Sequence, residues 1–304
     1  MFESLIRNLQ DATDVLKRAK NPTELAKGVM PNRWLSRHVL NDAESTGTTS
    51  ASPGEIAASL RALRNRLKGE AIDERGQVNY GRLRKSATYQ EMVSTSTILR
   101  GVDLTALASD AERIAFWTNL YNVLAIHGVL ALEIRTSVME IPSFFGTVSY
   151  DVGGHIVSLD EIENGILRRN APHPASGARL FGKGDTRIAL SPSYVDPRIH
   201  AALVCASTSC PPVAFYDAER LESQLDAATA GYVTADVRID DDEKRVTVPI
   251  TFRYYQADFG GMEGIWRFLS TYSVGGQREA IERASAGGYS IDYHRYDWSL
   301  NSIA

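Results

Sequence analysis

Two cysteines and a histidine are the residues of this chain whose types and spacing could do chemistry. Cys205 and Cys210 are the two cysteines of the sequence, and His200 precedes them by five and ten residues. A thiolate is a strong nucleophile when a nearby imidazole or helix N-terminus lowers the pKa of the thiol. The pattern therefore suggests nucleophilic catalysis, with Cys205 as the first candidate and Cys210 as a competing one.

Strand geometry works against that pairing. The apolar run at 198–204 (RIHAALV) predicts a buried strand that leads into the cysteines. Side chains five residues apart on a regular strand point to opposite faces, so His200 and Cys205 meet only if the strand breaks first. The polar residues after Cys205 and the Cys210-Pro211 pair allow such a break.

Three other interpretations of the same residues are open. A cysteine beside a histidine is more often a structural core residue than a catalytic one. A disulfide between the two is opposed by a reducing cytosol. Zinc binding by Cys205, Cys210 and His200 needs one more ligand, and the four-residue gap departs from the usual CxxC knuckle. We therefore expect no metal and no cofactor.

The elements that must position these residues form a mixed pattern. A long helix from Asp110 to about Leu132 opens with a capping box, Ser109-x-x-Glu112, and is apolar on nearly every face, so it belongs at the centre of a domain. Asn119 and Asn122 share one face of it, and their buried amides are either structural or part of the wall of a site, where they could donate to an oxyanion.

Two hairpins and a short helix complete the prediction. Gly153-Gly154 lies between two apolar runs and indicates a tight turn, and 237–239 and 246–250 flank a charged turn. Ser158-x-x-Glu161 caps a short helix through Arg168. The fold class is therefore α+β, with the central helix packed on a small, mostly antiparallel sheet; a papain-like arrangement is one form of it.

The domain organisation follows from composition along the chain. The first twenty residues predict an amphipathic helix, and the small, polar run at 41–54 indicates a linker. We expect an N-terminal helical segment with its linker at 1–54 and one α+β domain at 55–304.

Composition and charge narrow the classes of partner. The 304 residues are 43% hydrophobic and 23% charged, as in ordinary soluble proteins. The net charge of −4 offers no global field for a polyanion, so no nucleic-acid partner is expected. Charges within the first residues oppose a signal peptide, and the most apolar segment, 123–134, is too short to cross a bilayer. These features predict a cytoplasmic protein without a membrane partner.

Three long segments resemble the family called domain of unknown function 547. They are AERIAFWTNLYNVLAIHGVL at 111–130, SYDVGGHIVSLDEIENGILRRN at 149–170, and 196–233, which contains DPRIHAALVCASTSCPP; the C-terminal YDWSLN is similar to the extended bacterial form. The resemblance places a family-like core at about 107–233 and a C-terminal extension at 234–304. It implies a thiol-centred, papain-like site with Glu163, His200 and Cys205.

One position departs from the family pattern. The short helix usually reads Ile-Glu-His-Gly-Ile-Leu-Arg, whereas this chain has Asn164 after Glu163. Asparagine can orient an imidazole but is no general base near neutral pH.

Two hypotheses for function follow from these residues. In the first, Cys205, His200 and Glu163 hydrolyse an amide or thioester bond of a small peptide-like substrate. In the second, the chain is a non-catalytic interaction module whose N-terminal helix docks a partner protein or a second copy, forming a homodimer.

Overall fold

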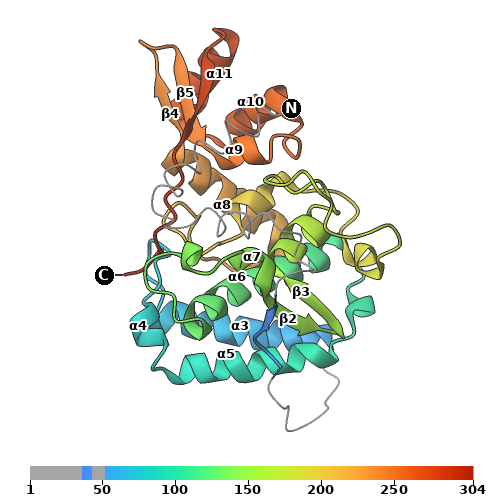
Figure 1. Ribbon diagram of the computed structural model, residues 1–304. Helices are drawn as coiled ribbons and strands as arrows, with labels where there is room; N and C mark the ends of the chain where they lie inside the picture. Colours follow the sequence, from blue (N-terminus) through green and yellow to red (C-terminus); the bar gives the residue numbers. More distant parts are fainter. Residues whose placement is uncertain (1–35, 43–51, 304) are drawn as a thin grey trace.

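The computed structural model describes residues 36–42 and 52–303. The predicted N-terminal helix and most of the predicted linker lie outside the described residues. The rest of the chain is α+β, as predicted, and contains two three-stranded sheets and many helices (Figure 1).

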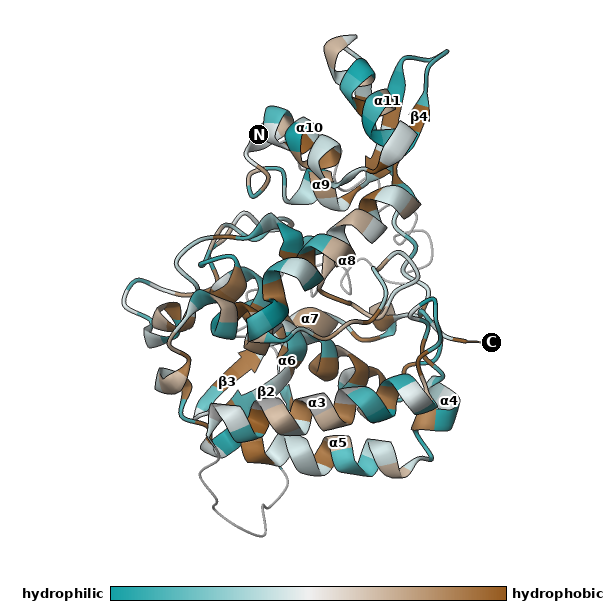
Figure 2. Ribbon diagram, turned by 180° about the vertical axis from the view of Figure 1, so that it is seen from behind, coloured by the Kyte–Doolittle hydropathy of each residue, from teal (hydrophilic) through white to brown (hydrophobic). Residues whose placement is uncertain are grey.

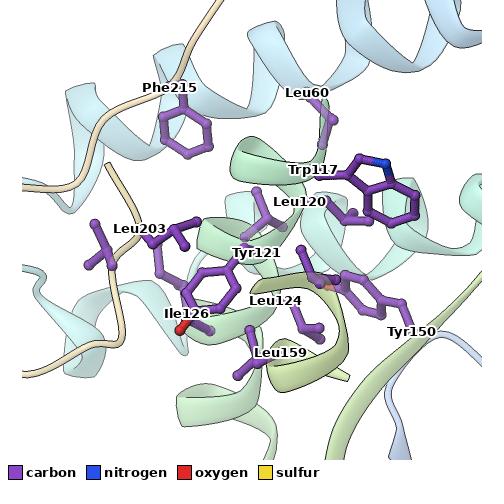
Figure 3. Packing of buried hydrophobic residues seen from close by; sticks show 14 of the residues in the cluster. Leu60, Trp117, Leu120, Tyr121, Leu124, Ile126, Tyr150, Leu159, Leu203 and Phe215 are labelled. Atoms are coloured by element: carbon purple, nitrogen blue, oxygen red, sulfur yellow. The ribbon is translucent and has the colours of Figure 1, made fainter. Parts of the chain in front are cut away.

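Helix α6 (Asp110–Ala131) lies at the centre of the larger part of the molecule. The predicted capping box is present, because Ser109 Oγ accepts from the Glu112 amide while the Glu112 carboxylate accepts from the Ser109 amide. The side chains of Trp117 and Leu124 are fully buried, and they pack with those of the surrounding elements (Figure 3). By length and composition α6 could cross a membrane, but 89% of its most apolar window is buried inside the protein. It is the core helix of this body.

Two longer helices line the outside of this body, and short helices lie between them and on either side of α6 in the chain. Both outer helices carry hydrophobic and hydrophilic residues (Figure 2), and α3 buries Ile56, Leu60, Leu63 and Leu67 in the core. The longer helices are α3 (Pro53–Glu70) and α5 (Ala87–Ile98); the short ones are α4 (Tyr80–Leu83), η2 (Leu99–Gly101), η3 (Leu104–Ala106), η4 (Val138–Glu140) and α7 (Phe144–Thr147).

The first sheet has the order β1–β2–β3, formed by His38–Val39, Val148–Val152 and His155–Ser158. β2 and β3 form the predicted hairpin, and Gly153 and Gly154 supply the positive φ angles of its turn. β1 pairs with β2 in parallel, so the sheet is mixed rather than mostly antiparallel. Directly after β3, Ser158 and Glu161 cap the short helix η5 (Glu161–Leu167), a single π-helical segment.

The predicted strand at 198–204 is wrong. Residues Pro197–Ala201 form a 3₁₀ helix, η7, and a loop follows it. Asp196 accepts a hydrogen bond from the Arg198 amide, and proline at the first helical position has a φ angle suited to a helical turn. The run is buried as expected, but its apolar residues line a helical turn. The preceding loop carries η6 (Thr186–Leu190).

The C-terminal unit is built around a second hydrophobic cluster, which includes Phe252, Phe259 and Leu269. It lies at one end of the molecule (Figure 1). In its sheet β5 pairs with β4 in the predicted hairpin and with β6 in parallel. Its elements are β4 (Arg238–Asp240), β5 (Arg245–Pro249), α9 (Thr251–Tyr254), α10 (Gly261–Tyr272), α11 (Gly275–Ala286) and β6 (Ser290–His294). It is reached from the larger body through η8 (Ala218–Arg220) and α8 (Leu221–Asp236), which contributes Leu225 to the first cluster and Val233 to the second.

After β6 the chain returns from this unit to the larger body (Figure 1). We call residues 296–303 the C-terminal strap. Its backbone forms isolated bridges with residues far away in sequence: Ser207 with Leu300, Ser137 with Ser299, and Val78 with Ser302. The strap thereby crosses the loop that holds the cysteines.

Candidate functional site

The loop after η7, which we call the thiol loop (residues 204–210), brings the two cysteines together. Cys205 and Cys210 form a disulfide, with Cα atoms 6.3 Å apart. Ala206 has a φ of +64°, and the Cys210 amide donates to the Ser207 carbonyl at 3.0 Å, so the loop turns sharply between the two sulfurs. In this structure the two cysteines are therefore joined by a disulfide, the bond that a reducing cytosol would disfavour. A disulfide sulfur is not a thiolate, so neither cysteine is a nucleophile until the bond is reduced.

Polar groups surround both sulfurs. The Cys205 amide donates to Cys210 Sγ at 3.0 Å. The Ser207 hydroxyl lies 3.3 Å from each sulfur. The Tyr296 hydroxyl, from the C-terminal strap, lies 2.9 Å from Cys205 Sγ and 3.2 Å from Cys210 Sγ. Both cysteines are partly exposed, so a reagent in solution has access to this polar cluster.

Glu163 acts on three tyrosines around the site, Tyr121, Tyr255 and Tyr296. It stands on η5, and its charge acts on the phenol of Tyr255. Burial, and then the charge of Glu163, raise the pKa of Tyr121 and Tyr255 well above the usual value. Burial also raises the pKa of Tyr296, and Glu163 adds to that rise. All three phenols are therefore protonated at neutral pH and act as hydrogen-bond donors.

His200 belongs to a buried charged network. Its Nε2 lies 2.9 Å from Asp258 Oδ2, and its ring stacks on Tyr255 with centroids 4.0 Å apart. Arg168 donates to both Asp258 oxygens, at 2.5 and 3.0 Å, and its side chain is 4% exposed. Burial disfavours the charged form of Asp258, but hydrogen bonds from His200 and Arg168 outweigh it and lower the pKa of Asp258 to about 2. This network connects η5 and η7 to the C-terminal unit.

The predicted catalytic residues fall into two neighbouring groups. Within the described residues no hydrogen bond joins His200 or Glu163 to either sulfur. Asp258, and not Glu163, orients the His200 imidazole. Tyr255 connects the groups, because its ring stacks on His200 and the charge of Glu163 raises the pKa of its hydroxyl.

The amides proposed for an oxyanion are engaged by the backbone. Asn122 Nδ2 donates to the carbonyls of Ala202 and Ala214, each at 3.0 Å, which uses both of its N–H groups. Asn119 exchanges two hydrogen bonds with the Tyr216 backbone, each at 2.8 Å. Both side chains hold the segments on either side of the thiol loop against α6.

Asn164 is a partner of the charged network. Its side-chain oxygen accepts from Arg168 Nη1 at 2.7 Å, and the same nitrogen donates to the Pro172 carbonyl at 3.1 Å. At the position where the family pattern has a histidine, this chain therefore carries a neutral acceptor that holds a buried guanidinium.

Sequence reasoning missed three residues of the site: Tyr255, Asp258 and Tyr296. Tyr296 opens the segment YDWSLN, which the sequence singled out only for its similarity to the family's extended form. Tyr255 and Asp258 stand outside any recognised pattern. No group of His, Cys, Asp and Glu side chains in the described part of the chain is arranged to hold a metal ion.

Residues 105–233 match the family model described as "Protein of unknown function, DUF547", close to the core expected at 107–233. No curated protein and no solved structure matches the chain. The matched segment contains both cysteines, His200 and Glu163, while Tyr255, Asp258 and Tyr296 lie beyond it.

Proposed function

We propose that the matched domain and the C-terminal strap form a thiol-dependent enzyme that carries out thiol–disulfide exchange at Cys205 and Cys210. The observation that carries this proposal is the convergence of hydrogen-bonding groups on both sulfurs of a partly exposed disulfide. A disulfide that only stabilises a fold does not require hydrogen-bond donors at its sulfurs. An exchange centre needs them, because one sulfur leaves as a thiolate.

The reaction conserves atoms and electrons. The thiolate of a substrate dithiol attacks one sulfur of the pair, which forms a mixed disulfide and releases the other sulfur as a thiolate. The second substrate thiol loses its proton and attacks the mixed disulfide. The substrate leaves as a disulfide, two electrons have passed to the protein, and the protein holds a dithiol after taking up two protons.

The test compares oxidised protein with its single-cysteine variants. We expect one equivalent of dithiothreitol to convert the oxidised protein to a dithiol, and Cys205→Ser and Cys210→Ser each to abolish exchange. The redox equilibrium is measured by thiol alkylation and mass spectrometry over a series of dithiothreitol ratios. A pair that carries two free thiols after air oxidation, or that resists the reagent in the folded protein, contradicts the proposal.

A second candidate is the cysteine hydrolase implied by the family resemblance, acting on an amide or thioester bond of a small peptide-like substrate. The buried His200–Asp258 pair favours it, because an imidazole oriented by a carboxylate is the usual base of such enzymes. Reduction has to come first, and the imidazole has to reach the Cys205 sulfur, which it does not contact here. Glu163 then supports the site through Tyr255.

The two candidates differ in what His200 does. For a hydrolase, the reduced protein cleaves thioester or peptide substrates, and His200→Ala abolishes cleavage. For an exchange enzyme, His200→Ala leaves the dithiothreitol equilibrium of the pair unchanged. Both assays on the same reduced preparation decide between them.

A further inference from the structure

The C-terminal strap is attached to the thiol loop along its length. The Asp297 amide donates to Ser209 Oγ at 2.8 Å, the Thr208 amide to the Ser299 carbonyl at 2.7 Å, and the Asn301 amide to the Ala206 carbonyl at 3.1 Å. The strap thus follows the loop from the residue after Cys205 to the residue before Cys210.

The same strap is held on its other side by the larger body. The Leu300 amide donates to the Thr136 carbonyl, and the Val78 amide donates to the Asn301 carbonyl, each at 2.8 Å. The Tyr80 hydroxyl donates to Asn301 Oδ1 at 2.8 Å. These contacts fix the backbone on which Tyr296 stands.

The hydroxyl protons of the cluster have one consistent arrangement. The Ser207 hydroxyl donates to the Tyr296 oxygen at 3.0 Å, so that oxygen is an acceptor of this bond. The Tyr296 proton is then directed to a sulfur, and the nearer one is Cys205 Sγ at 2.9 Å. Cys210 Sγ has a donor of its own, the Cys205 amide. Each sulfur is thereby assigned a different donor.

We infer that Tyr296 is the hydrogen-bond donor that stabilises the Cys205 thiolate when the disulfide opens, so that the strap completes the reactive site. This inference rests on the proposed thiol chemistry of the pair and adds a catalytic residue to it. Tyr296 lies outside the segment that matches the family, so the matched domain alone lacks this donor.

The surroundings of the phenol keep it a donor. Burial raises the pKa of Tyr296, the hydrogen bond from Ser207 opposes that rise, and the charges of Glu163 and Tyr254 reinforce it. Tyr121 and Tyr232 are further phenols whose pKa is raised in part by Tyr296. Because its pKa is raised, Tyr296 stays protonated at the pH where a thiol ionises.

The test measures the reactivity of each thiol separately. In the reduced Cys210→Ser protein, the rate of iodoacetamide labelling of Cys205 is followed against pH, with and without Tyr296→Phe. Loss of a hydrogen bond to a thiolate slows labelling near neutral pH about tenfold, which corresponds to a rise of about one unit in the pKa of Cys205. Tyr293→Phe, which removes a phenol three residues earlier on β6, is the matched control and leaves the rate unchanged.

A second pair of variants guards against a general disturbance of the loop. In the reduced Cys205→Ser protein, Tyr296→Phe leaves the labelling of Cys210 within about twofold, because the amide donor is still present. Thermal unfolding of every variant is measured alongside, and a melting temperature close to that of the parent shows that the loop is still folded.

The outcomes separate the two proposals. If Cys205 in the parent already labels like a free thiol, with a pKa near ~8.5, the exchange proposal fails. If Cys205 is activated in the parent and remains so in Tyr296→Phe, the exchange proposal stands and the role of Tyr296 is refuted. If Cys205 and Cys210 slow equally, the phenol acts on the loop as a whole and the specific assignment is also refuted.

Discussion

Replacing Asp258 by asparagine removes the carboxylate that pairs with both a buried guanidinium, Arg168, and a buried imidazole, His200. Arg168 and Asp258 side chains are 4% and 5% exposed, and His200 contacts the same carboxylate. Asparagine keeps the shape but leaves Arg168 without its counter-charge. Breaking a buried pair from one side costs about 3 to 5 kcal/mol, so we expect the free energy of unfolding to fall by that amount.

A matched control is available on the surface. Asp226 also accepts from an arginine, Arg198, at 2.7 Å, but its side chain is 55% exposed. Asp226→Asn therefore costs less than about 1 kcal/mol. Both variants exchange a carboxylate for an amide beside an arginine, but Asp226 is exposed and Arg198 keeps Asp196 and Glu222 as partners.

The assay is urea unfolding followed by tryptophan fluorescence at neutral pH. A third variant, Arg168→Met in the Asp258→Asn background, recovers part of the loss, since no uncompensated charge then remains at this position. Acid provides an independent check. Because the folded pKa of Asp258 is lowered to about 2, its contribution is present above the unfolded pKa and is lost as the pH falls from about 4 towards 2.

Two results would refute this reasoning. One is an Asp258→Asn protein no less stable than Asp226→Asn. The other is an acid dependence between about pH 4 and pH 2 that is identical in Asp258→Asn and in the parent protein. Either result would mean that the network of Arg168, Asp258 and His200 gives the folded protein no net electrostatic stabilisation.

Two further predictions concern α6 and η5. Burial lowers the pKa of His127 to about 4, so at this position the unfolded chain takes up a proton before the folded chain does as the pH falls. Between about pH 7 and pH 5 the free energy of unfolding should therefore drop by about 2 kcal/mol more in the parent than in His127→Gln. An equal drop in the two proteins would contradict this prediction. Gly165→Ala places a methyl group against the buried Phe181 ring and should cost about 1 to 3 kcal/mol in urea unfolding. Gly231→Ala in α8, where nothing lies within 4 Å, is its control and should stabilise by up to about 1 kcal/mol; a Gly165→Ala variant as stable as the parent removes the packing argument.

Local signals predicted the parts of the fold that depend on local interactions. The Ser109–Glu112 capping box and the apolar interior of α6 identified the central helix, and Gly153-Gly154 identified the first hairpin. Each pattern involves residues a few positions apart, and the hydrogen bonds that it implies form within the element itself. The run at 198–204 failed because a short apolar stretch suits a strand and a buried helical turn equally well.

The site depended on contacts between distant residues. His200 pairs with Asp258, which lies 58 positions later in the chain, and Cys205 contacts Tyr296, which lies 91 positions later. No periodicity links such pairs, and the C-terminal unit and the strap have to fold back before they meet. The Cys205–Cys210 spacing was visible in the sequence, whereas the donors that surround the two sulfurs were not.

The separation of 91 positions between Cys205 and Tyr296 also sets an order of events during synthesis. At roughly 5–20 residues per second, a ribosome adds Tyr296 roughly 5 to 20 s after Cys205. Through that interval both sulfurs exist without the phenol. Because the sulfurs are only five positions apart, a disulfide formed so early closes a small ring and ties down no distant part of the chain. The nascent protein can therefore oxidise at this pair without being trapped in a wrong topology, and its distinctive thiol chemistry begins only when the strap arrives.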